Sequence, residues 1–329
     1  MLKEGRSQLA AQTPRDEETV SQVGEFGLID RVTSGREQSP GTLIGPGDDA
    51  AVVAAPDGRV VATTDVLVEQ VHFRFDWSSP HQVGRKAVAV NLSDVAAMGA
   101  VPTGVLVGLS CPPDLSSSVV DELAEGMWEE AGRAGISLVG GDMVSSPVLT
   151  ISVTALGDLQ GRDPVTRSGA RPGDVVAVAG RIGWSAAGLA VLGRGFRSPL
   201  SVVGAHRVPE PPYAAGPRAA AGGATSMIDT SDGLLAELGH IADASAVSID
   251  VRTEMLEVPQ RLSEVASALG ADARHWVLTG GEDQALAATF PAGRPLPEGW
   301  RQIGVVGEGS GVTVDGAVYE GPGGWQHWR

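Results

Sequence analysis

Two short β-prone runs near the N-terminus meet at Pro56-Asp57-Gly58, and aspartates lie at their outer ends. Proline, aspartate and glycine between apolar runs are typical of a hairpin turn. If these residues form a three-residue loop, Asp49 lies opposite Asp65. Opposed carboxylates destabilise a β-ladder, so we expect a cation between them. An acidic turn exposed to water is the alternative interpretation.

A hard divalent cation, which prefers oxygen ligands, is the natural candidate for such a site. The hydroxyl groups of Thr63 and Thr64, directly before Asp65, would add neutral oxygen ligands. His72 follows between the apolar residues Val71 and Phe73. Its place just beyond the carboxylates makes it a candidate for contacting a substrate, and simple packing is the alternative.

The acidic composition argues against several classes of partner. The 329 residues carry a net charge of −16, which disfavours nucleic acid or an anionic membrane surface as the main partner. Cys111 is the single cysteine, so no intrachain disulfide can form, and this fits a reducing cytoplasm. No apolar run approaches transmembrane length, and the first 25 residues lack the apolar core of a signal peptide. We therefore expect a cytoplasmic protein with two domains or one large one.

A long helix is predicted from Ser79-Pro80, a capping residue followed by proline, to Met98, where Gly99 ends it. Asn91 and Asp94 are three residues apart and therefore share one face of this helix. An amide and a carboxylate on a helix otherwise rich in alanine and valine are costly to bury without partners. Either this face meets water, or Asp94 is a further metal ligand.

Glycines and acids recur at the expected ends of later strands. Gly140-Gly141-Asp142 and the Gly-Gly-Glu-Asp stretch at 280–283 each follow a predicted strand, the second at 276–278. Asp229-Thr230-Ser231-Asp232 leads from a predicted strand into a helix, where Ser231 or Asp232 would be the capping residue. Free backbone amides beside a carboxylate suit a nucleotide phosphate with its Mg²⁺.

The predicted elements of the first half follow the order β-β-α-β-α-β-β, which indicates a mixed sheet with helices packed on one face. A linker-like stretch with Arg162, Arg167 and Arg171 comes next, and its arginines are candidates for binding phosphate oxygens. For Arg162 and Arg171 a solvated loop is the simpler interpretation. A second mixed α/β unit then begins with a predicted strand at 174–179.

Aspartates from distant parts of the sequence are candidates for one site. They are Asp49, Asp65, Asp94, Asp142, Asp229 and Asp232. Aspartates without neighbouring histidine or cysteine favour Mg²⁺ over zinc or iron. Several Mg²⁺ ions held by aspartates suit phosphoryl transfer from ATP, in which the protein mainly supplies positioning and charge neutralisation. No Walker A motif, Rossmann fingerprint or protein-kinase motif set is present, so the nucleotide must be held in another way.

The ordered set of motifs resembles the thiamine-monophosphate kinase family, within the ATP-binding superfamily that includes aminoimidazole ribonucleotide synthetase and selenophosphate synthetase. The matching stretches span nearly the whole chain beyond residue 23. They are GEFGLID at 24–30, GDDAAVV at 47–53, TTDVLVEQVHF at 63–73, KAVAVNLSDVAAMGAVP at 86–102, GGD at 140–142, RSGARPGD at 167–174, IDTSDGL at 228–234, GGED at 280–283 and GW at 324–325.

The resemblance implies a two-domain α/β (α+β) fold of the synthetase type. It assigns residues 21–158 to an ATP- and Mg²⁺-binding dimerisation domain and 159–329 to an α/β domain. Residues 1–20 have no counterpart in the matching motifs, and their polar, charged composition predicts a disordered tail. Two chains would pair through their N-terminal mixed sheets into a barrel-like homodimer. The implied activity is the ATP-dependent phosphorylation of thiamine monophosphate to thiamine diphosphate by direct phosphoryl transfer, with several Mg²⁺ ions.

The resemblance also implies roles for individual residues. The Mg²⁺ ligands would be Asp49, Thr63, Thr64, Asp65, Asp94, Asp142, Asp229 and Asp232, and among them Asp49, Asp65, Asp94 and Asp229 would be catalytic. The ATP contacts would be Gly141, Asp142, Arg167 and Ser231, and the contacts to thiamine monophosphate would be His72, Glu282 and Trp325. The indole face of Trp325 suits stacking with a cationic thiazolium ring.

Two other functions remain open from the sequence. The first is another ATP-using synthetase or maturation enzyme of the same superfamily. A selenophosphate synthetase would need a reactive cysteine or selenocysteine near its N-terminus, whereas Cys111 lies in the middle of the sequence. A hydrogenase-maturation enzyme would end in a cysteine-bearing tail, whereas the last residues here are His327-Trp328-Arg329. The second alternative is a non-catalytic sensor of metal or nucleotide.

Overall fold

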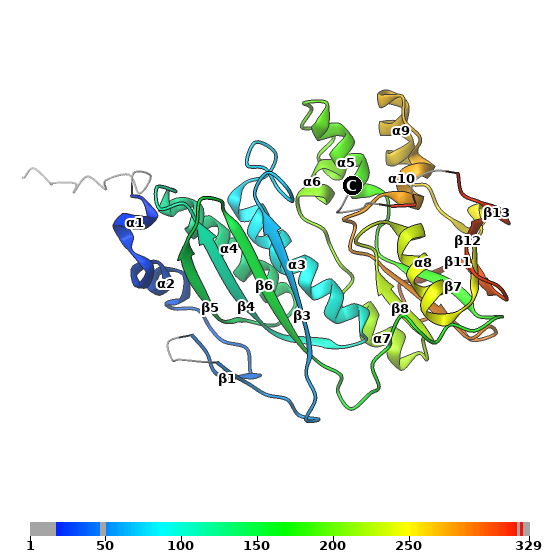
Figure 1. Cartoon of the computed structure of the whole chain (residues 1–329), viewed down its shortest axis with the longest axis horizontal. Coiled ribbons are helices and arrows are strands. Elements are labelled where there is room, and N and C mark those ends of the chain that lie inside the picture. Colours follow the sequence, from blue (N-terminus) through cyan, green and yellow to red (C-terminus); the bar gives the residue numbers. More distant parts are fainter. Residues whose placement is uncertain (1–17, 47–50, 321–322, 325–329) are drawn as a thin grey trace, which may run out of the picture.

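The computed structural model describes residues 18–46, 51–320 and 323–324. Within them, the strands form three sheets of two, four and seven strands. The two larger sheets lie in opposite halves of an elongated molecule, and helix α3 (Pro80–Ala97) runs between them (Figure 1). Among the helices of the described part of the chain, none is long and apolar enough to cross a membrane.

The four-stranded sheet has the order β3-β6-β4-β5. Its strands are β3 (Val61–Val68), β6 (Thr150–Asp158), β4 (Val101–Cys111) and β5 (Leu138–Ser145). Side chains along β6 are alternately buried and partly exposed, because one face of the sheet packs on α3 and α4 (Ser117–Arg133) while the other face is open. This arrangement confirms the predicted mixed sheet with helices on one face.

The predicted pairing of the two runs around Pro56-Asp57-Gly58 is wrong. Strand β2 (Val52–Val53) pairs with β1 (Thr42–Ile44), whereas β3 pairs with β6 along its whole length, which places Val153 opposite Asp65. Turn residues indicate where the chain changes direction, but they do not determine which strand a given strand pairs with. β6 offers β3 an uninterrupted ladder and a shared apolar face, which the short β2 does not.

Helix α3 begins as predicted and is the central element of the molecule. The Ser79 side chain accepts a hydrogen bond from the backbone N–H of Gln82, whose own side chain accepts one from the Ser79 N–H. Most of the helix is buried, because it packs on the four-stranded sheet and α4 while Ala96 and Ala97 pack against strands of the larger sheet.

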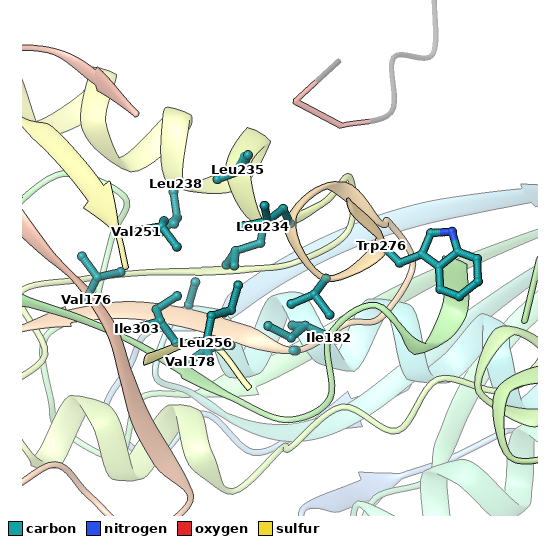
Figure 2. Close-up of a cluster of buried hydrophobic side chains, with 14 of the residues drawn as sticks. Val176, Val178, Ile182, Leu234, Leu235, Leu238, Val251, Leu256, Trp276 and Ile303 are labelled. Carbon is teal, nitrogen blue, oxygen red and sulfur yellow. The ribbon is translucent and has the colours of Figure 1, made fainter. Parts of the chain in front are cut away.

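The seven-stranded sheet has the order β13-β12-β9-β11-β7-β10-β8. Its strands are β13 (Ala317–Val318), β12 (Gly311–Val314), β9 (Ser248–Val251), β11 (Trp300–Gly307), β7 (Val175–Ala179), β10 (Leu286–Phe290) and β8 (Ser226–Asp229). A large apolar cluster on one face joins it to the helices α5 (Trp184–Gly193), α6 (Leu200–Arg207), α8 (Leu234–Ser245), α9 (Gln260–Leu269) and α10 (Ala273–Thr279). Figure 2 shows part of this cluster.

The second face of this sheet packs on α7 (Ala215–Ala221) and on the end of α3. Val176 and Val178 of β7 therefore belong to one cluster, and Ala177 and Ala179 to the other. Both faces of β7 are buried, which explains its continuous apolar sequence. The remaining short elements are α1 (Val20–Val23), α2 (Glu25–Thr33) and the 3₁₀ turn η2 (Thr253–Met255).

Three local predictions are corrected by the structure. Residues 276–278 lie in helix α10 and not in a strand, because a short apolar run does not distinguish a strand from a buried helix. Gly140-Gly141-Asp142 lies inside β5, which continues alongside β4. Neither Ser231 nor Asp232 caps helix α8. Its N-cap is Gly233, whose φ of 119° disfavours other residues.

Candidate active site

Strand β3 and helix α3 bring two of the predicted carboxylates to one place. Thr63 Oγ1 donates a 2.8 Å hydrogen bond to Asp94 Oδ2, and the backbone N–H of Asp65 donates one of 2.8 Å to Asn91 Oδ1. Thr63 and Asp65 lie on the face of β3 that packs on α3, in register with Ala155 and Val153 of β6. The buried amide of Asn91 thus holds the strand in position, while Asp94 and Asp65 form a carboxylate pair.

A third carboxylate reaches this pair from the other half of the molecule. Asp229 ends β8, is 5% exposed, and accepts a 3.0 Å hydrogen bond from Ser93 Oγ on α3. Burial, followed by the charge of Asp94, raises the pKa of Asp229 well above its usual range. Burial and then the charge of Asp65 raise the pKa of Asp94 to about 6. The three carboxylates therefore repel one another, as expected of groups that await a cation.

The two threonines of the predicted metal set point in opposite directions. Thr63 joins the carboxylates, whereas Thr64 lies on the open face of the sheet, where it donates to the Val153 carbonyl at 3.0 Å and contacts Thr154 Oγ1 at 3.2 Å. Adjacent residues of a strand face opposite sides, so both hydroxyls of one chain cannot approach the same ion.

Asp142 also lies on the open face. Its register places it beside Gly108, in the row of Ser152, and it lines an open cavity of about 1120 Å³ there. Three strand spacings, roughly 14 Å, separate β5 from β3. Within one chain the structure therefore does not bring Asp142 to the carboxylates. At Gly141 a Cβ atom would lie 2.1 Å from the Val107 carbonyl oxygen, so the close contact of the two strands requires glycine.

Arg167 and Ser231 approach the carboxylates from the second half of the sequence. The pKa of Asp94 is raised by burial and by Asp65, and the positive charge of Arg167 opposes part of this rise, so the two side chains interact. Ser231 Oγ and the backbone N–H of Asp232 both donate 3.0 Å hydrogen bonds to Glu237 Oε1. Glu237 is 3% exposed, and burial raises its pKa. The sequence reasoning missed this glutamate, although an acid in the first turn after the Asp-Thr-Ser-Asp motif could have signalled it.

The Gly-Gly-Glu-Asp segment lies directly against the Asp-Thr-Ser-Asp segment. The backbone N–H of Glu282 donates to the Ser231 carbonyl at 2.6 Å, and that of Gln284 to the Thr230 carbonyl at 3.2 Å. A Cβ on Gly281 would lie 2.7 Å from the Ser231 carbonyl oxygen, so the two backbones approach too closely for another residue. Glu282 itself has a φ of 62°, which is costly for a residue with a side chain.

Glu282 is held by two residues that the sequence reasoning missed. Lys86 Nζ lies 2.9 Å from Glu282 Oε1 and donates a second hydrogen bond of 3.1 Å to the His72 carbonyl. His206 Nδ1 lies 3.4 Å from Glu282 Oε2 and 3.0 Å from Ser185 Oγ. Burial raises the pKa of Glu282, but the charge and hydrogen bond of Lys86, together with the neighbouring histidines, outweigh burial, so the pKa falls below its usual range. The Glu282 side chain as a whole is 37% exposed, so part of it borders the site.

His72 lies in the turn after β3. Its Nδ1 accepts a 3.0 Å hydrogen bond from the backbone N–H of Val68, which fixes the ring against its own turn and leaves Nε2 on the other side of the ring. His72, Lys86 and Glu282 therefore lie together at the N-terminal end of α3. Asp49 and Trp325, the two other predicted site residues, lie outside the described residues.

Comparison with known proteins matches this arrangement to a family. Residues 47–159 match the model of the AIR synthase related protein, N-terminal domain. The chain is 51% identical over 320 residues to the thiamine-monophosphate kinase of Mycobacterium tuberculosis, which covers 97% of this chain and 94% of that protein. The chain belongs to the thiamine-monophosphate kinase family. It is also 43% identical over 300 residues to the enzyme of that name from Corynebacterium glutamicum, with 89% of this chain and 88% of that protein covered.

A solved structure of the same family agrees with the fold. AaThiL complexed with AMPPCP and TMP has a TM-score of 0.78 and 35% identity to this chain, and the match covers 93% of this chain and 98% of AaThiL. The resemblance inferred from the motifs and the predicted fold class are both confirmed. The division into domains and the roles of the individual site residues stay predictions.

Proposed function

We propose that this chain transfers a phosphoryl group from ATP to thiamine monophosphate and so forms thiamine diphosphate. The observation that supports this best is the gathering of Asp65, Asp94 and Asp229 around α3 in a member of the thiamine-monophosphate kinase family. Lys86, which holds Glu282, lies eight residues before Asp94, or about 12 Å along the helix axis. That spacing suits a substrate with its phosphate at the carboxylates and its thiamine end at Glu282.

The donor atoms in this cluster suit Mg²⁺. Asp94 and Asp229 each accept a hydrogen bond from a hydroxyl group. Burial and neighbouring negative charge raise the pKa of both carboxylates. A hard cation would relieve this repulsion. In the described part of the chain, no three acidic, histidine or cysteine side chains already form a cation site. We infer that Asp65, Asp94 and Asp229 would hold Mg²⁺, with Asp49, Thr63 and Asp232 as further proposed ligands. Bound there, Mg²⁺ neutralises charge on the transferring phosphoryl group.

The phosphoryl group is proposed to pass directly between substrates. A serine–histidine pair does lie near Glu282, but Ser185 is 1% exposed and its Oγ faces the His206 ring in the interior. Ser185 therefore cannot reach a substrate as a nucleophile would have to. We predict that labelled ATP alone leaves no label on the protein. A phosphoprotein that thiamine monophosphate discharges would contradict direct transfer.

ATP contacts are proposed for Gly141, Asp142, Arg167 and Ser231, and substrate contacts for His72, Glu282 and Trp325. We also propose a cytoplasmic homodimer that pairs through the open face of the four-stranded sheet, and a division into domains near residue 158, where β6 ends. In such a dimer Thr64 and Asp142, which face away from the carboxylates of their own chain, would lie at the interface.

The test of the proposed function is turnover. The purified chain with ATP, Mg²⁺ and thiamine monophosphate should form thiamine diphosphate, detected by separation of the thiamine esters. Thiamine itself serves as the control acceptor, because it lacks the phosphate that receives the transferred group. Binding of ATP without formation of thiamine diphosphate would favour the nucleotide sensor instead.

A further inference from the structure

Lys86 joins three elements that come from distant parts of the sequence. It lies on α3, it donates to the carbonyl of His72 in the turn after β3, and it pairs with Glu282 in the segment before β10. The distances are 3.1 Å and 2.9 Å. Both partners belong to residues proposed to contact the thiamine end of the substrate, so one ammonium group sets their separation.

Lys86 lies behind the surface of the site, and two of its three donors are used by His72 and Glu282. The residue is 4% exposed, and a buried ammonium must spend its donors on acceptors within the protein. Glu282, by contrast, keeps more than a third of its side chain in contact with solvent. The ammonium therefore supports Glu282 from the interior, while the exposed part of the Glu282 side chain borders the site.

The backbone beneath Glu282 is fixed independently of Lys86. On one side the Glu282 N–H donates to the Ser231 carbonyl. On the other, Asp283 accepts hydrogen bonds from the backbone N–H groups of Gly183 and Ser185 at the start of α5. Because the main chain is held from two directions, removal of Lys86 would release the Glu282 side chain and the His72 turn and leave the segment in place.

We propose that Lys86 is a positioning residue that orients the Glu282 carboxylate and the His72 turn for the thiamine end of the substrate. This inference rests on the proposed function and deepens it. Its effect is on affinity for thiamine monophosphate. Asp94 lies eight residues further along α3, where Asp65 of β3 and Asp229 of β8 meet it, and none of the three is bonded to the ammonium.

The experiment compares Lys86→Met with the wild type. The KM for thiamine monophosphate should rise roughly tenfold or more, since a hydrogen bond between charged groups is lost, while the KM for ATP stays within about twofold. Lys86→Gln retains a neutral donor of shorter reach and should give an intermediate KM. It also replaces the methionine variant if that variant does not fold.

Arg85→Met is the matched control. Arg85 is the neighbouring residue on α3, but its guanidinium pairs with the buried Glu130 at 2.8 Å on the side facing α4. Its loss should lower the Tm and leave the KM for thiamine monophosphate unchanged. A change in KM that merely follows lost stability would appear in this variant too.

A double-mutant cycle with Glu282→Gln decides whether Lys86 acts through Glu282. If it does, adding Lys86→Met to Glu282→Gln should raise the KM for thiamine monophosphate by much less than Lys86→Met does alone. Additive effects, or an unchanged KM in an active Lys86→Met variant, would overturn the inference. Absence of turnover in the wild type would instead overturn the proposed function, so the two failures are distinguishable.

Discussion

At the scale of the residue, Asp94 is a proposed metal ligand whose negative charge costs the metal-free protein stability. Burial and the charge of Asp65 raise its pKa to about 6, so the folded chain binds a proton more tightly than the unfolded chain does. The free energy of unfolding therefore falls as pH rises from about 4 to about 6, where Asp94 loses its proton in the folded chain. Above that range the destabilisation by the charged carboxylate no longer changes with pH. A residue that repels its neighbours in the metal-free protein is a sign of a functional site.

We predict that Asp94→Asn stabilises the metal-free protein and abolishes activity. At pH 8 the Tm should rise by roughly 1.5 °C per kcal/mol of repulsion removed, because the amide still accepts a hydrogen bond from Thr63 and carries no charge. The gain should vanish at pH 4. Turnover should fall about a thousandfold. Added Mg²⁺ should raise the Tm of the wild type more than that of the variant. A lower Tm for Asp94→Asn at pH 8 would contradict the repulsion.

His206 gives the opposite pH dependence. Burial lowers its pKa to about 4, with Lys86 and Arg207 acting in the same direction and Glu282 against them. The unfolded chain therefore binds the proton first, and the stability associated with neutral His206 is full above pH 6.5 and lost as pH falls towards 4.

We predict that the free energy of unfolding of the wild type decreases by up to ~3 kcal/mol from this group between pH 6.5 and 4. His206→Gln, which keeps a polar contact for Ser185, should show a shallower decrease over the same range. Urea unfolding at several pH values measures this. Equal slopes for both proteins would show that His206 takes up no proton on unfolding.

At the scale of elements, the contact between α3 and α4 depends on two glycines. A Cβ at Gly84 would lie 2.0 Å from the Leu123 carbonyl oxygen, and one at Gly126 would lie 1.9 Å from the His81 carbonyl oxygen. Each helix thus presents a glycine to the backbone of the other. This close approach fixes the rotation of α3, and with it the direction in which Lys86 and Asp94 point.

We predict that Gly84→Ala lowers the Tm by several degrees and lowers turnover, because α3 must move away from α4. The control is Gly132→Ala in the same helix pair. Gly132 lies in α4 with no atom within 4 Å of its Cβ position, so alanine should raise stability by up to about 1 kcal/mol. Thermal unfolding and the thiamine diphosphate assay measure both variants. A Gly84→Ala protein as stable as the wild type would show that the contact can relax.

At the scale of the whole molecule, the open face of the four-stranded sheet is where we propose that a second chain binds. Val66 and Val144 lie on this face and are 45% and 54% exposed, and the cavity of about 1120 Å³ lies beside them. An exposed apolar sheet face of this kind is typical of protein interfaces. The chain has a mass of 33.7 kDa, so sedimentation should give twice that value.

We predict that Val144→Arg converts the dimer to a monomer, because the guanidinium would be buried without a partner in the interface. Leu200→Arg is the control. Leu200 is 71% exposed at the start of α6, in the other half of the molecule, and the charge should leave the mass unchanged. A dimeric mass for Val144→Arg as well as for the wild type would place the interface elsewhere.

Local patterns in the sequence predicted a large part of this protein. The Ser79-Pro80 start of α3, the buried strands and the place of Asp94 beside Asn91 follow from capping, proline geometry and helical spacing. The motifs also identified the family, because each is a short run of residues that can be recognised without knowing the fold. These features depend on neighbours only a few residues apart.

Tertiary structure decided what local patterns could not. Strand β3 pairs with β6 and not with β2, which is nearer in the sequence. In this pairing Thr63 lies on the side of the carboxylates and Thr64 on the open face of the sheet. Lys86 gains its role from Glu282, 196 residues further along the chain. A lysine in an otherwise apolar helix does not by itself indicate which distant residue it will pair with. Pairing, burial and pKa shifts depend on which distant segments meet, and that choice is made by the packing of both sheets against α3.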